Sequence, residues 1–245
     1  MNVKEYLIAR MKKGTIHLAL LDPDKQDSSE AGSIAKKMKE AGADAIMIGG
    51  STGVTSENLG ATARSIKEMS GLPTIHFPGG PTLSKEVDSI FFMSMVNSRD
   101  PFWIINAQAG ASAKVKELGI ETISLGYIIV EPGMKVGEVG KADAIKHDDI
   151  GRAVGYALAC EMFGMDLVYL EAGSGADRPV PPAMISAVKK AISIPLIVGG
   201  GIRTPAAANA ARLAGADAIV TGTFIEKCSD DTMLRSVVDA SKGRR

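Results

Sequence analysis

The chain has 245 residues, of which 45 % are hydrophobic and 4 % aromatic, and its 28 basic side chains equal its 28 acidic ones. This length is enough for one large core, and the balanced charge excludes binding of nucleic acid or an anionic membrane by net charge alone. No stretch approaches the roughly 18 apolar residues that span a bilayer, and charges interrupt the opening MNVKEYLIARMKKG, where a signal peptide would be apolar. We therefore expect a cytoplasmic protein.

Eight short apolar runs follow one another along the chain, and each is typical of a buried strand. They are residues 16–21, 45–49, 73–77, 89–93, 122–130, 167–171, 195–200 and 218–222. Most are separated by segments with apolar residues at helical spacing, and glycines stand where these helices would end: Gly42, Gly71, Gly119, Gly164 and Gly215. Eight strands alternating with helices over about 250 residues favour an α/β fold, a closed (β/α)8 TIM-type barrel, over an open doubly wound sheet.

Two intervals depart from this regular alternation. Only residues 78–88, PGGPTLSKEVD, separate the third and fourth strands, and their prolines and glycines leave little room for a helix. We therefore expect the third barrel helix to be missing or reduced. The fifth strand is followed by a long polar loop, residues 131–149, and loops of this length are usually lids, partner contacts or disordered segments.

The loops after the seventh and eighth strands carry GGGIRT and TGTF, where barrels of this kind commonly hold phosphate. Glycines let backbone N–H groups approach an anion closely. The alternative is that these glycines only turn the chain, but the position of both loops favours a phosphate cup formed by Gly200, Gly201, Gly222 and Thr223. The sequence thus predicts a single phosphate-binding barrel domain over residues 1–245.

Asp22 ends the first strand, and Ser51 follows the second strand on the same rim. One carboxylate and one hydroxyl are too few for calcium but suit Mg²⁺, which usually keeps waters and takes other oxygens from substrate phosphates. In the alternative interpretation, Asp22 or Asp24 is a helix N-cap and Ser51 a turn residue. Position alone does not decide between these interpretations.

A further carboxylate, Glu171, ends the sixth strand within YLEAGSG. At the carboxyl end of a barrel strand it would face the opening, where it could accept a proton from a substrate hydroxyl or hydrogen-bond a polyol. The alternative role is to neutralise Arg203. The first interpretation makes Glu171 the leading candidate for a general base.

Eight stretches, taken in order, closely resemble the geranylgeranylglyceryl phosphate synthases of archaea, a family that includes the bacterial heptaprenylglyceryl phosphate synthases. They are HLALLDPDK, IMIGGST, FFMSMVNS, PFWIINAQ, GYIIVEPG, YLEAGSGA, IVGGGIRT and VTGT. The resemblance covers almost the whole chain; YLEAGSG and FFMS are specific, whereas GGGIRT and TGT fit many phosphate-binding barrels. It implies a Mg²⁺-dependent prenyltransferase that joins the geranylgeranyl group of its diphosphate to the primary hydroxyl of sn-glycerol 1-phosphate, the first ether bond of archaeal membrane lipids.

The resemblance also implies roles for individual residues. Asp22 and Ser51 would hold Mg²⁺, Asp22 and Glu171 would be catalytic, and Phe102 and Trp103 are candidate walls of a groove for the prenyl chain. Residues implied for sn-glycerol 1-phosphate are Tyr169, Leu170, Glu171, Ala172, Gly173, Ser174, Gly175, Gly200, Gly201, Gly222 and Thr223. The family's barrel has its third helix replaced, as the short interval predicts.

Assembly and substrate choice remain broader predictions. The family's VGxVG stretch often carries an aromatic residue in its larger rings, whereas this chain has Glu138 there, so we expect only a homo-oligomer that is at least a dimer. Three alternatives stay open: the same chemistry with a longer prenyl diphosphate, a phosphate-binding isomerase or synthase of small metabolites, and a non-catalytic phosphosugar-binding protein.

Overall fold

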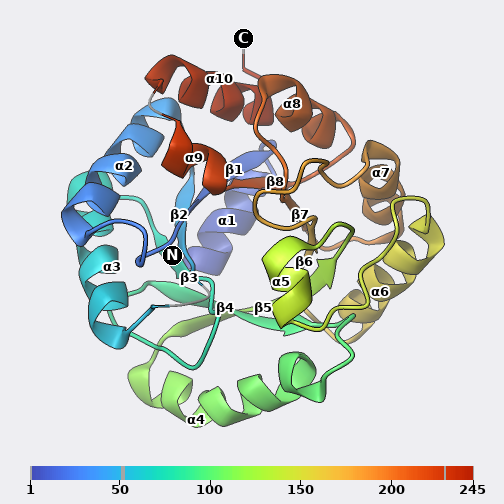
Figure 1. Ribbon diagram of the computed structural model, residues 1–245, viewed down its shortest axis with the longest axis horizontal. Coiled ribbons are helices and arrows are strands. Elements are labelled where there is room, and N and C mark those ends of the chain that lie inside the picture. Colours follow the sequence, from blue (N-terminus) through green and yellow to red (C-terminus); the bar gives the residue numbers. More distant parts are fainter. Residues whose placement is uncertain (1, 51–52, 229, 245) are drawn as a thin grey trace.

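The computed structural model describes residues 2–50, 53–228 and 230–244. Within these residues, eight parallel strands close into a barrel in chain order, with β1 paired to both β2 and β8 (Figure 1). They are β1 Ile16–Leu21, β2 Ala45–Ile48, β3 Thr74–His76, β4 Ser89–Met95, β5 Glu121–Ile129, β6 Leu167–Glu171, β7 Leu196–Gly199 and β8 Ala218–Thr221. The predicted (β/α)8 barrel is confirmed, and each predicted strand lies within two residues of its observed bounds.

Helices surround this barrel as an outer ring (Figure 1). The ring contains α2 Ser28–Ala41, α3 Ser56–Ser70, α4 Ala107–Leu118, α6 Ile150–Met162, α7 Pro182–Ala191, α8 Pro205–Leu213 and α10 Asp231–Lys242. A π-helix, η1 Phe102–Asn106, leads directly into α4. Three further helices lie inside this ring in the view of Figure 1. Helix α1 Val3–Met11 lies behind the strands, and the short α5 Met134–Val139 and α9 Thr223–Lys227 lie in front of them.

The predicted glycine stops explain how helices return to the barrel. Gly42, Gly71 and Gly119 cap α2, α3 and α4 with φ angles of 102°, 65° and 66°, in the left-handed region that glycine tolerates best. Gly164 and Gly215 also have positive φ but lie one residue beyond the cap residues of α6 and α8. No helix in the described residues is both long and apolar enough to cross a membrane.

The third barrel helix is missing, as predicted. Residues 77–88 carry no helix, and the chain passes from β3 directly to β4. Pro78 and Pro81 remove two backbone donors from this short segment, which disfavours a helix. Val87 and Leu83 instead pack into the same apolar cluster as Leu59 of α3, so this side of the barrel is covered without a helix.

The chain also ties the strands together at their amino ends. Four aspartates stand just before strands, and a carboxylate oxygen of each accepts the backbone N–H of a residue near the start of the preceding strand, at 2.7–3.0 Å. Each also pairs with at least one basic side chain. We call these the floor carboxylates: Asp44, Asp88, Asp166 and Asp217. Three of them lie in similar stretches of sequence: Asp44 and Asp217 in AGADAI, and Asp166 in FGMDLV.

Candidate active site

A pocket opens at the carboxyl ends of β1, β6, β7 and β8, where catalytic residues of such barrels lie. Eight residues predicted for the substrate line it together: Tyr169, Glu171, Ser174, Gly175, Gly200, Gly201, Gly222 and Thr223. Its other lining residues are Leu20, Ile202, Arg203, Val220, Thr221 and Phe224. Segments from three separate strand ends therefore converge on one hollow, as the sequence predicts.

Glu171 is the last residue of β6 and is only 6 % exposed. Its Oε1 accepts a hydrogen bond of 2.6 Å from the backbone N–H of Gly173. Gly199 pairs with it on β7, and a Cβ there would lie 2.2 Å from the Tyr169 hydroxyl and 3.1 Å from Glu171 Oε2. The space around the carboxylate therefore depends on glycine at the end of β7.

The surroundings of Glu171 favour its uncharged form. Burial raises the pKa of Glu171 above its ordinary value of 4.5, although Tyr169 and the N–H of Gly173 act in the opposite direction. Burial and then the charge of Glu171 also raise the pKa of the Tyr169 hydroxyl well above 10, so this hydroxyl keeps its proton as a donor. A carboxylate whose pKa is raised is a better proton acceptor once it is ionised.

The alternative pairing of Glu171 with Arg203 does not occur. The Arg203 guanidinium instead donates to the backbone carbonyls of Gly175 and Ala176. No ion pair of Glu171 is found in the described part of the chain. The carboxylate is thus left to interact with whatever enters the pocket.

The predicted phosphate cup lies beside Glu171. Gly200 and Gly201 have φ angles of 83° and 70°, and a Cβ on Gly201 would lie 2.9 Å from the backbone nitrogen of Pro179. Ser174 and Thr223 join the loops after β6 and β8 through a hydrogen bond of 2.6 Å between their hydroxyls. Close backbone approach and paired hydroxyls are suited to an anion such as phosphate.

Three of the residues implied for the substrate lie outside this lining. Leu170 and Ala172 are fully buried in the apolar layer between the barrel and its outer helices. Gly173 packs against residues 133–134, because a Cβ on it would lie 2.6 Å from the carbonyl carbon of Gly133. Side chains alternate along β6, so Leu170 and Ala172 pack behind the pocket, whereas Tyr169 and Glu171 face it.

Asp22 lies on the same rim, 19 % exposed by its side chain, and its Oδ2 is 2.6 Å from Lys25 Nζ. The interpretation of Asp22 or Asp24 as the helix cap is wrong, because Asp27 caps α2 by accepting the N–H of Glu30. Ser51 lies outside the described residues. Residues 2–50, 53–228 and 230–244 hold no group of three or more His, Cys, Asp or Glu side chains that could bind a metal.

A magnesium ion that takes most of its oxygens from water and substrate nevertheless fits Asp22. Lys25 contacts Oδ2, whereas Oδ1 faces Gly49, where an added Cβ would lie only 2.9 Å away. The absence of a side chain on Gly49 keeps this face of the carboxylate accessible. Metal binding by Asp22 stays a prediction.

Comparison with known proteins decides the family. Residues 7–241 match the PcrB family. The chain belongs to the PcrB family. A geranylgeranylglyceryl phosphate synthase of Thermococcus kodakarensis is 53 % identical over 238 residues, covering 97 % of this chain and 94 % of that protein. One of Methanosphaera stadtmanae is 48 % identical over 233 residues, covering 95 % of each.

A solved structure agrees with these relatives. The (S)-3-O-geranylgeranylglyceryl phosphate synthase of Thermoplasma acidophilum, in complex with its substrate sn-glycerol-1-phosphate, has a TM-score of 0.97 to this PcrB-family chain. It is 41 % identical, and the match covers 99 % of both chains. The family resemblance predicted from the motifs is confirmed.

Sequence reasoning missed two features of this PcrB-family site. Lys25 bridges Asp22 to Glu226 of α9, with 2.8 Å between Lys25 Nζ and Glu226 Oε2. Lys25 follows Asp22 by three residues in LLDPDK, which is a usable signal, but Glu226 lies 201 residues away and carries none. The second is the attachment of Arg203 to the loop after β6, since GGGIRT gives no indication of its partners.

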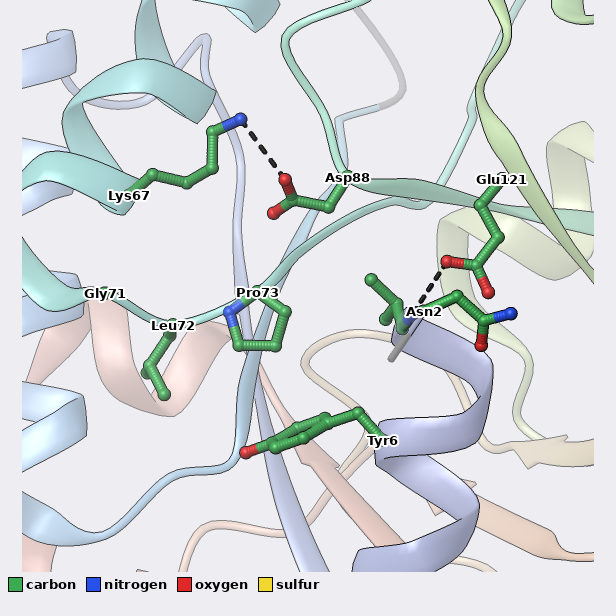
Figure 2. Close-up of a pocket in the computed structure, with 9 residues that line it drawn as sticks. Asn2, Tyr6, Lys67, Gly71, Leu72, Pro73, Asp88 and Glu121 are labelled. Carbon is green, nitrogen blue, oxygen red and sulfur yellow. Dashed lines mark hydrogen bonds and ion pairs between the residues drawn. The ribbon is translucent and has the colours of Figure 1, made fainter.

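A larger hollow of about 600 Å³ lies at the opposite end of the barrel (Figure 2). Its charged groups already have partners: Lys67 pairs with Asp88 at 3.2 Å, and the Glu121 carboxylate accepts the N–H groups of Val3 and Lys4. Figure 2 shows the Lys67–Asp88 pair and one of the hydrogen bonds of Glu121. Charged groups that already have partners contribute few free donors or acceptors to a ligand. The larger volume of this hollow therefore does not favour it as the active site.

Proposed function

We propose that this PcrB-family protein is a geranylgeranylglyceryl phosphate synthase, a prenyltransferase that makes an ether bond between geranylgeranyl diphosphate and sn-glycerol 1-phosphate. The observation that carries the proposal is the buried Glu171 carboxylate beside the glycine-lined cup. Relatives of nearly equal length bear this name at about half identity. The longer-donor enzyme, the isomerase and the binding protein are outcomes of the test below.

The pocket supplies two kinds of contact for the acceptor. The phosphate would lie against the backbone of Gly200, Gly201 and Gly222 and the hydroxyls of Ser174 and Thr223. The glycerol hydroxyls would then reach Tyr169 and Glu171, which line the same pocket. Holding phosphate at one end fixes which hydroxyl is presented for reaction, and such positioning supplies much of a rate enhancement.

The reaction then needs one proton transfer. The primary hydroxyl oxygen of glycerol 1-phosphate forms a bond to C1 of the prenyl group, while the bond between C1 and the diphosphate oxygen breaks. The hydroxyl proton passes to the Glu171 carboxylate, and diphosphate leaves with the bonding electrons. Tyr169 keeps its proton and orients the acceptor as a hydrogen-bond donor.

Asp22 and Ser51 are the residues we propose to hold Mg²⁺. When bound, the ion would neutralise diphosphate and improve it as a leaving group. Asp22→Asn should therefore raise the Mg²⁺ concentration needed for half-maximal activity, which a titration after chelator treatment measures. An unchanged requirement would remove Asp22 from this role.

The prenyl chain needs an apolar surface near the rim. Trp103 packs partly buried against the barrel core, and the Phe102 ring meets it edge-on with 5.1 Å between centroids. Phe102 is 47 % exposed, which leaves apolar area for a ligand. We propose these two side chains as part of the groove. We further propose that the protein works in the cytoplasm as a homo-oligomer, at least a dimer, which sedimentation analysis tests.

One assay tests the function. Purified protein is incubated with Mg²⁺, sn-glycerol 1-phosphate and prenyl diphosphates of graded length, and organic-extractable product is measured. We expect most product from geranylgeranyl diphosphate, and little when sn-glycerol 3-phosphate replaces the acceptor. A preference for a longer donor would move the protein to the heptaprenyl branch. Absence of product from every donor would contradict the prenyltransferase function.

A further inference from the structure

Arg203 is the one cationic side chain among the described residues that line the pocket, and the proposed mechanism gives it no role. It extends from the loop after β7 to the loop after β6, where its Nη2 donates to the carbonyls of Gly175 and, at 2.5 Å, of Ala176. We infer that Arg203 is a positioning residue for the acceptor: it holds residues 173–176 in the shape that closes the phosphate cup and adds positive charge beside the phosphate. This inference rests on the proposed function.

The base of Arg203 is held rigidly. The preceding residue, Ile202, is 3 % exposed, and the following residue, Thr204, caps α8 by accepting the N–H of Ala207. The guanidinium therefore projects from a fixed point of the backbone. A planar guanidinium on such a base suits two adjacent carbonyls, because its donors keep a fixed geometry.

The loop that Arg203 contacts needs an external attachment. Gly173 and Gly175 have φ angles of 101° and 79°, and glycine segments of this kind have many accessible conformations. Ser174 ties the same loop to Thr223, after β8, through the 2.6 Å hydroxyl contact. Arg203 and Ser174 together link the loops after β6, β7 and β8, which are the three walls of the cup.

The charge of Arg203 matters for a separate reason. Glu171 is the other charged residue in the described pocket lining, and a phosphate dianion would bring further negative charge beside it. Both hydrogen bonds of Arg203 come from Nη2, and no bond from Nε or Nη1 occurs in the described chain. These remaining N–H groups can donate to a bound anion, and hydrogen bonds between charged groups are stronger than neutral ones.

The test measures acceptor binding without catalysis. Calorimetry gives the Kd of sn-glycerol 1-phosphate, and separately of inorganic phosphate, in the absence of Mg²⁺ and prenyl donor. Arg203→Gln should weaken both at least about tenfold, as expected for loss of a charge-assisted contact. Arg203→Lys should bind with intermediate affinity, because an ammonium keeps the charge but not the fork. The salt dependence of Kd should be retained in the lysine variant and reduced in the glutamine variant.

Arg178→Gln is the matched control, since it removes the same charge from the loop after β6, which Arg203 contacts, without altering the pocket lining. Its Kd should equal that of the unmodified protein. In steady-state assays, Arg203→Gln should raise KM for glycerol 1-phosphate and leave kcat and the donor KM within about twofold.

Two results would overturn the role of Arg203: a normal Kd in Arg203→Gln, or an equal loss of affinity in Arg178→Gln. If the glutamine variant fails to fold, a normal Kd in Arg203→Lys overturns it instead. The outcome is separable from the proposed function. A protein that binds glycerol phosphate through Arg203 but makes no prenylated product keeps this inference and loses the prenyltransferase assignment.

Discussion

At the residue scale, Glu171 is buried and has no cationic partner in the described chain. Its ionised form is therefore unfavourable in the folded protein, and the carboxylate is a stronger proton acceptor. Glu171→Gln keeps the shape and can still accept the N–H of Gly173, but it cannot take a proton. We expect kcat to fall about 10²-fold or more, with a smaller change in KM. Steady-state kinetics check this against Glu138→Gln, an exposed substitution on α5 that should leave kcat unchanged.

The same residue predicts a stability effect of known sign. The folded-state pKa of Glu171 is raised, so its contribution to stability is fully present below about 4.5 and is lost as pH rises through the folded pKa. Above 4.5 this stability is lost, because the carboxyl ionises more readily in the unfolded chain than at its buried position, so Glu171→Gln should raise Tm at neutral pH. The gain should shrink as pH falls toward 4.5, because below this value the carboxyl is uncharged in both the folded and the unfolded chain. Calorimetry across this range measures it; a lower Tm for the variant at neutral pH would contradict the burial argument.

The side chains of the site could be predicted only in part. Glu171 and the glycines were found because a charge at the end of an apolar strand, and glycines after it, are local signals. Asp27 displaced Asp22 as the cap because its carboxylate reaches the N–H of Glu30, and nearby candidates differ only in such geometry. Pairings such as Lys25 with Glu226 depend on the closed barrel and leave no local trace.

At the element scale, the 131–149 segment is tied to the site. Gly133 donates its N–H to Ala172 at 2.9 Å and lies directly against Gly173. Gly173→Ala would place a Cβ 2.6 Å from the Gly133 carbonyl carbon at a φ of 101°, so we expect both activity and Tm to fall, the strained backbone alone costing about 1–2 kcal/mol. Gly155→Ala on α6 has open space, so it should keep activity and should not lower Tm, because alanine favours a helix over glycine. Activity and Tm are measured for both variants. Unchanged values for Gly173→Ala would show that the site does not depend on its contact with the 131–149 segment.

A second element, α10, is attached to the floor of the barrel by a buried ion pair. Lys242 Nζ lies 2.6 Å from Asp44 Oδ2, and the two side chains are 7 % and 0 % exposed. Lys242→Met should destabilise the fold by about 3 kcal/mol, because Asp44 loses a partner where water cannot replace it. Lys37→Met removes the exposed pair with Asp231, also on α10, and should cost less than about 1 kcal/mol. Urea unfolding compares the two; equal losses would contradict the role of burial.

At the scale of the whole molecule, the barrel was predictable because its physical causes are local. Parallel strands buried on both faces give continuous apolar runs, and a glycine that ends a helix precedes several of these runs. The absence of the third helix could be predicted because the interval between β3 and β4 is short and its prolines disfavour a helix. The fold of the 131–149 segment was not predictable, since it depends on contacts with other loops: Ser98 pairs with Ala142, and the Gly133 N–H donates to the Ala172 carbonyl.

The floor carboxylates have a consequence for engineering. The hydrogen-bond partners of these carboxylates in the described chain are Arg10, His17 and Lys242 for Asp44, Lys67 and Thr74 for Asp88, Lys4 and Ser124 for Asp166, and Lys189 and Leu196 for Asp217. None of these partners lines the active-site pocket. Strand register is thus secured at one end of the barrel, and substrate is selected at the other. Combinatorial libraries that vary the rim for new acceptor alcohols can keep one constant scaffold, so selection for specificity need not begin with a search for foldable variants.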